Sequence, residues 1–245
     1  MYVVISAAIV ITGASLIPDL DNSRSLAHST LSAFGGVLSA GMKSVSVAVQ
    51  GLTSTKYDKD DRNPHRKLWH TFFAWALVGL GLTALFSLPG SFTLPLLGTR
   101  TVGWLFALLV FFTCFQLSLM GLFAPKVKKA KGKFGPVGEV VIDVLTFFGT
   151  FYLMSRFPPD AGFRWMAVAF VIGTFVHLFG DLLTKMGIPA FFPLRVKGRR
   201  WFFVRILPLT SGGTVEKGVF APLFMLIIVV SILKLTGVLS LIGVG

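Results

Sequence analysis

Charged residues are scarce in this chain, and acidic residues are the scarcest. Only 13% of the 245 residues are charged, which is roughly half the usual share in a soluble domain. The single cysteine, Cys114, excludes an intramolecular disulfide, and because it lies in an apolar run we expect it to be a small core residue. No internal repeat is visible. The composition therefore excludes an ordinary soluble domain and a disulfide-stabilised one.

Long apolar runs take the place of charge. Hydrophobic residues make up 54% of the chain, and several runs reach the roughly 18 residues that a helix needs to cross a membrane. We predict an all-α, polytopic integral membrane protein that forms one membrane domain over residues 1–245. The first run lacks the positive n-region of a signal peptide, so we interpret it as a retained helix. The six predicted spans cover about 1–17, 68–88, 101–124, 139–157, 163–183 and 219–242.

Lysine and arginine are distributed unevenly over the segments between these spans. Residues 18–67, 125–138 and 184–218 together hold 19 of the 23 basic residues, whereas the opposite side of a six-span arrangement holds three. The positive-inside rule places the basic side in the cytoplasm, so we expect both termini outside. The basic loops 126–133 and 195–205 either reflect this topology alone or bind anionic membrane lipid.

The stretch of about 26–52 has a different pattern. Its apolar residues recur every three to five positions, from Leu26 to Val49, and serines and Gly35-Gly36 separate them. This spacing predicts an amphipathic helix rather than a seventh span. The helix either lies in the membrane interface or packs on other cytoplasmic loops, and the sequence favours neither alternative.

Ionisable residues at a membrane edge are costly and often mark functional sites. Three clusters of this kind fall on the predicted cytoplasmic side. They comprise Asp19 and Asp21 after the first span, His65, Arg66 and His70 at the entry to the second, and His177 and Asp181 at the end of the fifth. Carboxylates on a proline turn suit a divalent cation, and the i, i+4 spacing puts His177 and Asp181 on one helix face. Histidine and aspartate together favour a first-row metal site.

Each cluster also has a purely structural interpretation. The first could be a polar helix terminus, the second an interfacial anchor with a snorkelling Arg66, and the third a His–Asp hydrogen bond within the bundle. Glu216 precedes the last span on the same side, where it is either a further acidic site residue or an acid favoured by the helix dipole. We expect Asp58, Asp60 and Asp61, in a loop of mixed charge, to be solvated.

The order and spacing of the three clusters resemble a known family, the YdjM-like (LexA-regulated) membrane-bound metal-dependent hydrolases. The matching stretches are Leu16–Ser25, His65–Thr71 and His177–Pro193. Lys67 and Trp69 stand where that family usually has small Gly and Thr residues. The family is thought to be distantly similar to zinc-dependent phospholipase C and related nucleases.

The resemblance implies a ligand set and a group of catalytic residues. The implied metal ligands are Asp19, Asp21, His65, His70, His177 and Asp181. The implied catalytic residues are Arg66, Asp21 and Glu216. The implied cofactor is a divalent metal ion, Zn²⁺ or alternatively Mn²⁺.

We therefore expect a metal-dependent hydrolase at the cytoplasmic face of a bacterial or archaeal plasma membrane. Metal-activated water would cleave a phosphoester of a lipid or lipid-linked substrate, and Arg66 would neutralise phosphate oxygens. The alternative is a non-enzymatic scaffold or transporter with a structural or vestigial metal site, although the absence of repeats argues against a transporter. Anionic membrane lipids are the expected partners, and nucleic acid is not expected.

Overall fold

The computed structural model shows a mostly helical chain and describes residues 2–22, 25, 27, 32–58, 66–95, 98–134, 136–158, 161–207, 209 and 210. Six α-helices lie in this part of the chain: α1 (Tyr2–Ala14), α3 (Ser32–Thr53), α4 (Phe72–Phe86), α5 (Val102–Phe134), α6 (Pro136–Ser155) and α7 (Arg164–Leu182). Two short 3-10 turns, η1 (Ile17–Asp21) and η2 (Leu68–His70), follow α1 and precede α4. Strands β1 (Ser91–Leu94) and β2 (Gly98–Thr101) join α4 to α5.

Three helical segments are long and apolar enough to cross a membrane, namely Tyr2–Asp21, Val102–Leu122 and Arg164–Leu182. They coincide with the first, third and fifth predicted spans. The second predicted span is shorter than expected, because α4 begins only at the Thr71 cap and has 15 residues, or about 22 Å of helix. α6 occupies the fourth predicted span without meeting the same criterion, and the sixth, 219–242, lies outside the described residues. The count of six spans thus stays a prediction.

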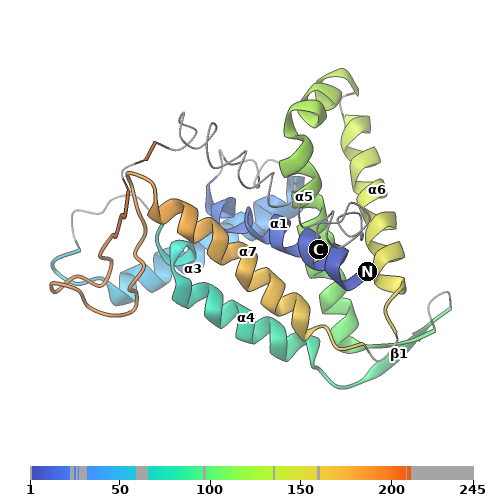
Figure 1. Cartoon of the computed structure of the whole chain (residues 1–245), viewed down its shortest axis with the longest axis horizontal. Coiled ribbons are helices and arrows are strands. Elements are labelled where there is room, and N and C mark those ends of the chain that lie inside the picture. The colour runs from blue at the N-terminus through green and yellow to red at the C-terminus, as the bar shows by residue number, and fades with distance from the viewer. Residues whose placement is uncertain are drawn as a thin grey trace, which may run out of the picture.

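α1 lies between α5 and α7 at the centre of the packing (Figure 1). Two glycines allow the backbones to come this close. A Cβ atom at Gly13 would meet the carbonyl oxygen of Cys114 at 2.0 Å, and one at Gly173 would meet that of Ile11 at 2.3 Å. Small residues at such crossings are typical of membrane helices. Cys114 is fully buried at this contact, which confirms its assignment to the core.

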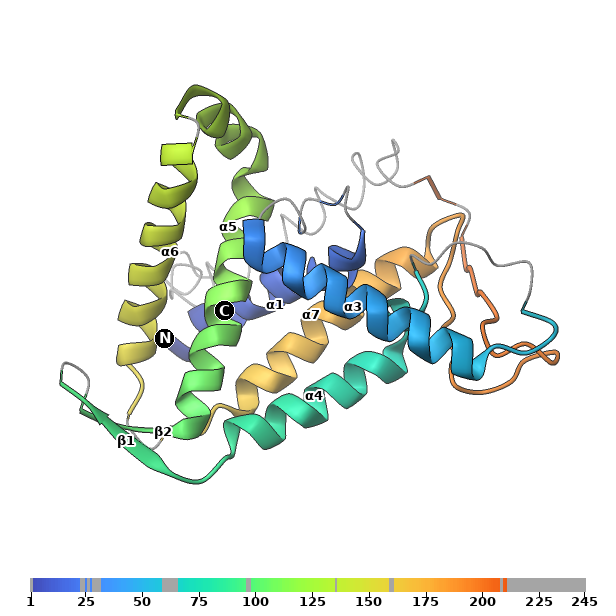
Figure 2. The same cartoon turned by 180° about the vertical axis from the view of Figure 1, so that it is seen from behind.

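α5 and α6 form an antiparallel pair that Figures 1 and 2 both show standing beside α1. α5 has 33 residues, about 50 Å of helix, and the segment 125–138 that was expected to be a loop is helical on both sides of residue 135. Its alanines and lysines are good helix formers, which explains the difference. Gln116 of α5 donates a hydrogen bond to Asp143 of α6, so the acid in the fourth predicted span has a partner.

The expectation of an all-α protein is wrong in one detail, the β hairpin. Ser91 pairs with Thr101 and Leu94 with Gly98 in antiparallel register, and the hydroxyls of Thr93 and Thr99 lie 3.2 Å apart across the strands. Threonine is favoured in strands, and this short segment was interpreted only as a connection between spans. The hairpin lies at the end of α4 opposite η2 (Figure 2).

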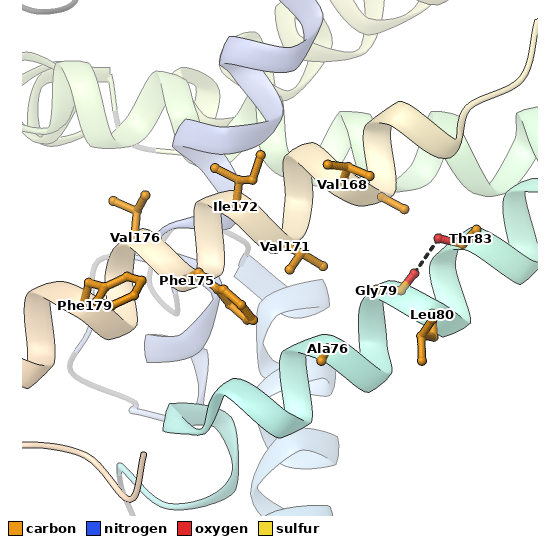
Figure 3. Close-up of a pocket in the computed structure, with 11 residues that line it drawn as sticks. Ala76, Gly79, Leu80, Thr83, Val168, Val171, Ile172, Phe175, Val176 and Phe179 are labelled. Carbon is orange, nitrogen blue, oxygen red and sulfur yellow. Dashed lines mark hydrogen bonds between the residues drawn. The ribbon is translucent and has the colours of Figure 1, made fainter. Parts of the chain in front are cut away.

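An open apolar groove of about 720 Å³ runs between α4 and α7 (Figure 3). Its one polar side chain is Thr83, whose hydroxyl donates to the carbonyl of Gly79 at 2.8 Å. Phe175 and Phe179 line it from α7, on the helix face opposite His177 by the 3.6-residue period. The groove is therefore separate from the polar clusters.

α3 packs against other segments of the chain, which is one of the two arrangements that the sequence left open. Leu38 and Met42 pack against the core, and the carbonyl of Met42 accepts a hydrogen bond of 2.6 Å from the indole of Trp69. Val37 (72%) and Leu52 (85%) on the same helix are exposed. The helix thus packs on the chain before α4, and its placement in the membrane interface stays a prediction.

Asp58 corrects an expectation, because it is buried rather than solvated. Its carboxylate accepts hydrogen bonds from the backbone N–H and hydroxyl of Thr55, at 2.7 and 2.8 Å, and from the N–H of Trp201 at 3.1 Å. A longer bond of 3.4 Å comes from Arg200 N–H. Burial raises the pKa of Asp58, but these hydrogen bonds outweigh it, so the pKa lies below its ordinary value. Asp58 therefore fastens the loop after α7 to the end of α3.

We expect Asp58→Ala to destabilise this junction by about 2 kcal/mol, since several donors to a charged acceptor lose their partner. The stabilisation is fully present above the unfolded carboxyl pKa of about 3.9 and is lost as the pH falls through the lowered folded pKa. Limited proteolysis of the 195–205 loop in detergent measures the effect, with Lys56→Ala as the exposed control. Equal cleavage rates in both variants at neutral pH would contradict the assignment.

Candidate metal centre

The first acidic residues are presented by the turn that follows α1. Pro18 lies at the start of η1, where its missing N–H leaves no helical hydrogen bond unmade. Residues two apart in a 3-10 turn differ by about 240° in direction, so Asp19 and Asp21 do not face the same way. The Asp19 side chain keeps 36% of its surface exposed, whereas Asp21 is buried.

His70 is the last residue of η2 and is completely buried. The turn around it is fixed on both sides. The indole of Trp75 donates to the carbonyl of Trp69 at 2.6 Å, and Thr71 caps α4 by accepting from the N–H of Ala74 at 3.1 Å. The imidazole therefore belongs to a rigid corner rather than to a solvated loop.

His177 and Asp181 complete the arrangement from the last turns of α7. Asp19, His70 and His177 form a group that could hold a metal ion, with one ligand atom from each within 4.8 Å of the others. The Oδ1 of Asp19 lies 3.5 Å from His70 Nε2 and 3.7 Å from His177 Nε2. Asp181 Oδ2 lies 3.3 and 3.4 Å from the same two nitrogens. Two carboxylates and two imidazoles from three parts of the chain thus converge.

The distances between the imidazole nitrogens and the carboxylate oxygens are compatible with a bound ion. Donor atoms that each lie about 2.05 Å from a tetrahedral zinc ion are about 3.3 Å apart, and the four N···O distances run from 3.3 to 3.7 Å. These distances are longer than the 2.7–3.2 Å that is usual for N–H···O hydrogen bonds. The group of Asp19, His70 and His177 is therefore one that could hold a metal ion.

Two atoms of the cluster strengthen this fit. His177 Nε2 and Asp181 Oδ2 are both buried and lie 3.4 Å from each other. Buried polar atoms of this kind need a partner. His177 also hydrogen-bonds the backbone of Ser15, which is how a metal-binding histidine is usually oriented. The residues present thus suit a divalent ion with nitrogen and oxygen ligands.

Arg66 lies beside the cluster and is held by two contacts. Its Nη2 is 3.0 Å from Asp181 Oδ1, and its Nη1 donates to the hydroxyl of Thr184 at 2.9 Å. That hydroxyl in turn donates to the carbonyl of Asp181 at 2.8 Å. The backbone of Arg66 has a positive φ of 66°, which is uncommon outside glycine and concentrates at functional sites.

The structure thus brings together Arg66, Asp19, His70, His177 and Asp181 of the residues predicted from the sequence. Asp21 is buried close by in η1 but is not one of the three residues whose ligand atoms group together. His65 and Glu216 lie outside the described residues, so their predicted roles as ligand and catalytic acid stay predictions.

Sequence reasoning missed two supporting residues. Thr184 follows Asp181 by three positions, and its place within the Asp-Leu-Leu-Thr motif was the available signal. Ser15 acts through its backbone, so no side-chain pattern could have indicated it.

Comparison with known proteins identifies a family. The family model described as YdjM inner membrane protein matches residues 3–240. No curated protein matches the chain, and no solved structure does. The match includes η1, η2 and α7, which carry the converging side chains, and three helical segments able to span a membrane. Because the match extends over nearly the whole sequence, the chain belongs to the YdjM inner membrane protein family.

Proposed function

We propose that this protein is a membrane-embedded, metal-dependent hydrolase that cleaves a phosphoester of a lipid or lipid-linked substrate. The observation that carries the proposal is the convergence of Asp19, His70 and His177 as a group that could hold a metal ion, with Asp181 next to both imidazoles. The basic segments of the chain support a location of this site at the cytoplasmic face, with the N- and C-termini outside.

Each residue has a definite task in this mechanism. When bound, Zn²⁺ or Mn²⁺ would supply Lewis acidity, which polarises a phosphoryl oxygen and lowers the pKa of water towards about 7. Asp19 is the most exposed of the four ligand side chains, so substrate and water would enter on its side. Asp181 fixes Arg66, and the remaining guanidinium donors of Arg66 can contact phosphate oxygens in a fork.

A substrate screen tests the proposal. The protein is purified in detergent, loaded with Zn²⁺ or Mn²⁺, and assayed on bis-p-nitrophenyl phosphate, phosphatidic acid and phosphatidylglycerol, beside His177→Ala. We expect metal-dependent hydrolysis of at least one of these compounds, and none above background in the variant. If the loaded protein leaves every compound intact, the metal is structural and the scaffold alternative replaces the hydrolase.

A further inference from the structure

The loop that follows α7 displays an unusual surface. The sequence from Lys185 to Leu207 contains six basic residues and no acidic one. Five large apolar side chains on the same loop are exposed: Met186 (54%), Phe191 (51%), Leu194 (67%), Ile206 (64%) and Leu207 (46%). Isolated exposed apolar residues are normal in proteins, but a group of them among cations is characteristic of a surface that binds another phase or molecule.

This exposure does not result from a loosely held loop. Phe192 and Trp201 are buried against each other, with ring centroids 4.4 Å apart, and Phe192 also contacts Phe73 of α4. Ile188 and Val204 exchange backbone hydrogen bonds of 3.1 and 2.8 Å. The loop thus has its own packed interior, and we call the exposed surface around it the outer side.

The loop is also attached to both neighbouring elements. The N–H of Ile206 donates to the carbonyl of Leu182 at 2.8 Å, at the end of α7. Asp58 and Thr55 hold the other side of the loop to the end of α3. The outer side therefore has a fixed position at the end of α7 that carries Asp181 and Thr184.

We propose that residues 185–207 form a platform that binds the anionic phospholipid surface of the membrane. The exposed apolar side chains would enter the boundary between headgroups and acyl chains, and Arg195, Lys197 and Arg199 would contact phosphate groups. The apolar side chains distinguish this partner from nucleic acid, which would neutralise the cations and leave Leu194 and Ile206 in water. The platform does not depend on the proposed hydrolase. If that function holds, the platform collects anionic lipid at the edge of the site.

A fluorescent label at position 194 tests the platform. Leu194→Cys is labelled with an environment-sensitive dye, while the only native cysteine, Cys114, is buried. The protein in neutral detergent micelles is then titrated with phosphatidylglycerol or phosphatidylcholine. We expect a blue shift with phosphatidylglycerol alone. Because each cation near a charged surface contributes about a fivefold change in affinity, Arg195→Gln/Lys197→Gln should raise the half-saturating lipid fraction by about 20-fold.

Three controls make the outcome decisive. Arg156→Gln/Arg164→Gln removes the same charge at the other end of α7 and should change nothing, and a dye on Thr93→Cys in the hairpin should not respond. Arg195→Lys keeps the charge and should keep binding, which separates loss of charge from loss of fold. An equal response to both lipids, an unaffected double variant, or a saturable response to single-stranded DNA in place of lipid would overturn the proposal. The lipid titration needs neither bound metal nor substrate turnover. Its result therefore does not depend on whether the protein is a hydrolase.

Discussion

His177→Ala should leave less than about a tenth of the metal that the wild-type protein binds. His177 provides one of two imidazoles in a cluster whose other members are carboxylates, and removing one of about four ligands opens the coordination shell to water. Asp181 would then keep only His70 of its two neighbouring imidazoles. Inductively coupled plasma mass spectrometry of detergent-purified protein, after reconstitution with Zn²⁺ or Mn²⁺, measures the metal content.

A comparison of the two acids in η1 makes this test sharper. Asp19→Asn should lose metal as His177→Ala does, because Asp19 belongs to the converging group. Asp21→Asn should retain most of it, because the 3-10 turn directs this residue elsewhere. Phe179→Ala, an exposed change on the opposite face of α7, serves as the control for purification and folding. Full metal content in Asp19→Asn, or no metal in the wild type, would reject the site as described.

Arg66→Lys should reduce kcat/KM on a phosphoester by about 10²- to 10³-fold while the metal content stays near that of the wild type. Lysine keeps the positive charge but lacks the planar fork that Arg66 presents from its contacts with Asp181 and Thr184. Loss of one donor to a developing oxyanion typically has an effect of this size. Steady-state kinetics on the compound found in the screen gives the ratio.

Thr184→Val tests how much the position of the Arg66 guanidinium matters while the guanidinium itself is unchanged. We expect a loss of about 10- to 100-fold, since residues that orient site groups typically contribute this much, and Thr184→Ser should restore most of the activity. Calorimetric titration with inorganic phosphate gives a second readout without turnover, in which Arg66→Lys should bind more weakly. Unchanged kinetics and phosphate affinity in Arg66→Lys would show that the arginine has only a structural role.

The sequence identified the residues that could form the site, but it did not show which of them the fold brings together. The i, i+4 spacing of His177 and Asp181 fixes their relation on any helix, so that pair could be found without coordinates. The choice between Asp19 and Asp21 could not, because it depends on whether the residues after Pro18 form a 3-10 turn or extended chain. The contact of His70 with the α7 pair is a tertiary event for which only the shared membrane face gave a signal.

The fold shows the same division between local and distant information. Apolar runs indicated the helices because each run is a local property of 15 to 20 residues. Asp58 was assigned to solvent because its nearest neighbours in the sequence are charged, yet Trp201 from another segment supplies one of its donors. The helical continuation of α5 beyond residue 124 was missed because a drop in hydropathy marks the end of a membrane span, and does not mark the end of a helix.

The position of α1 between α5 and α7 also constrains how the protein is made. Gly13 and Gly173 allow α1 to contact two helices that are synthesised much later, and Asp19 leaves the ribosome long before His177 and Asp181. During synthesis α1 is therefore made before the helices that it packs against. Until α7 follows, the Asp19 carboxylate lacks its neighbour His177. If the proposed ion binds at this cluster, its capture would therefore follow the synthesis of α7.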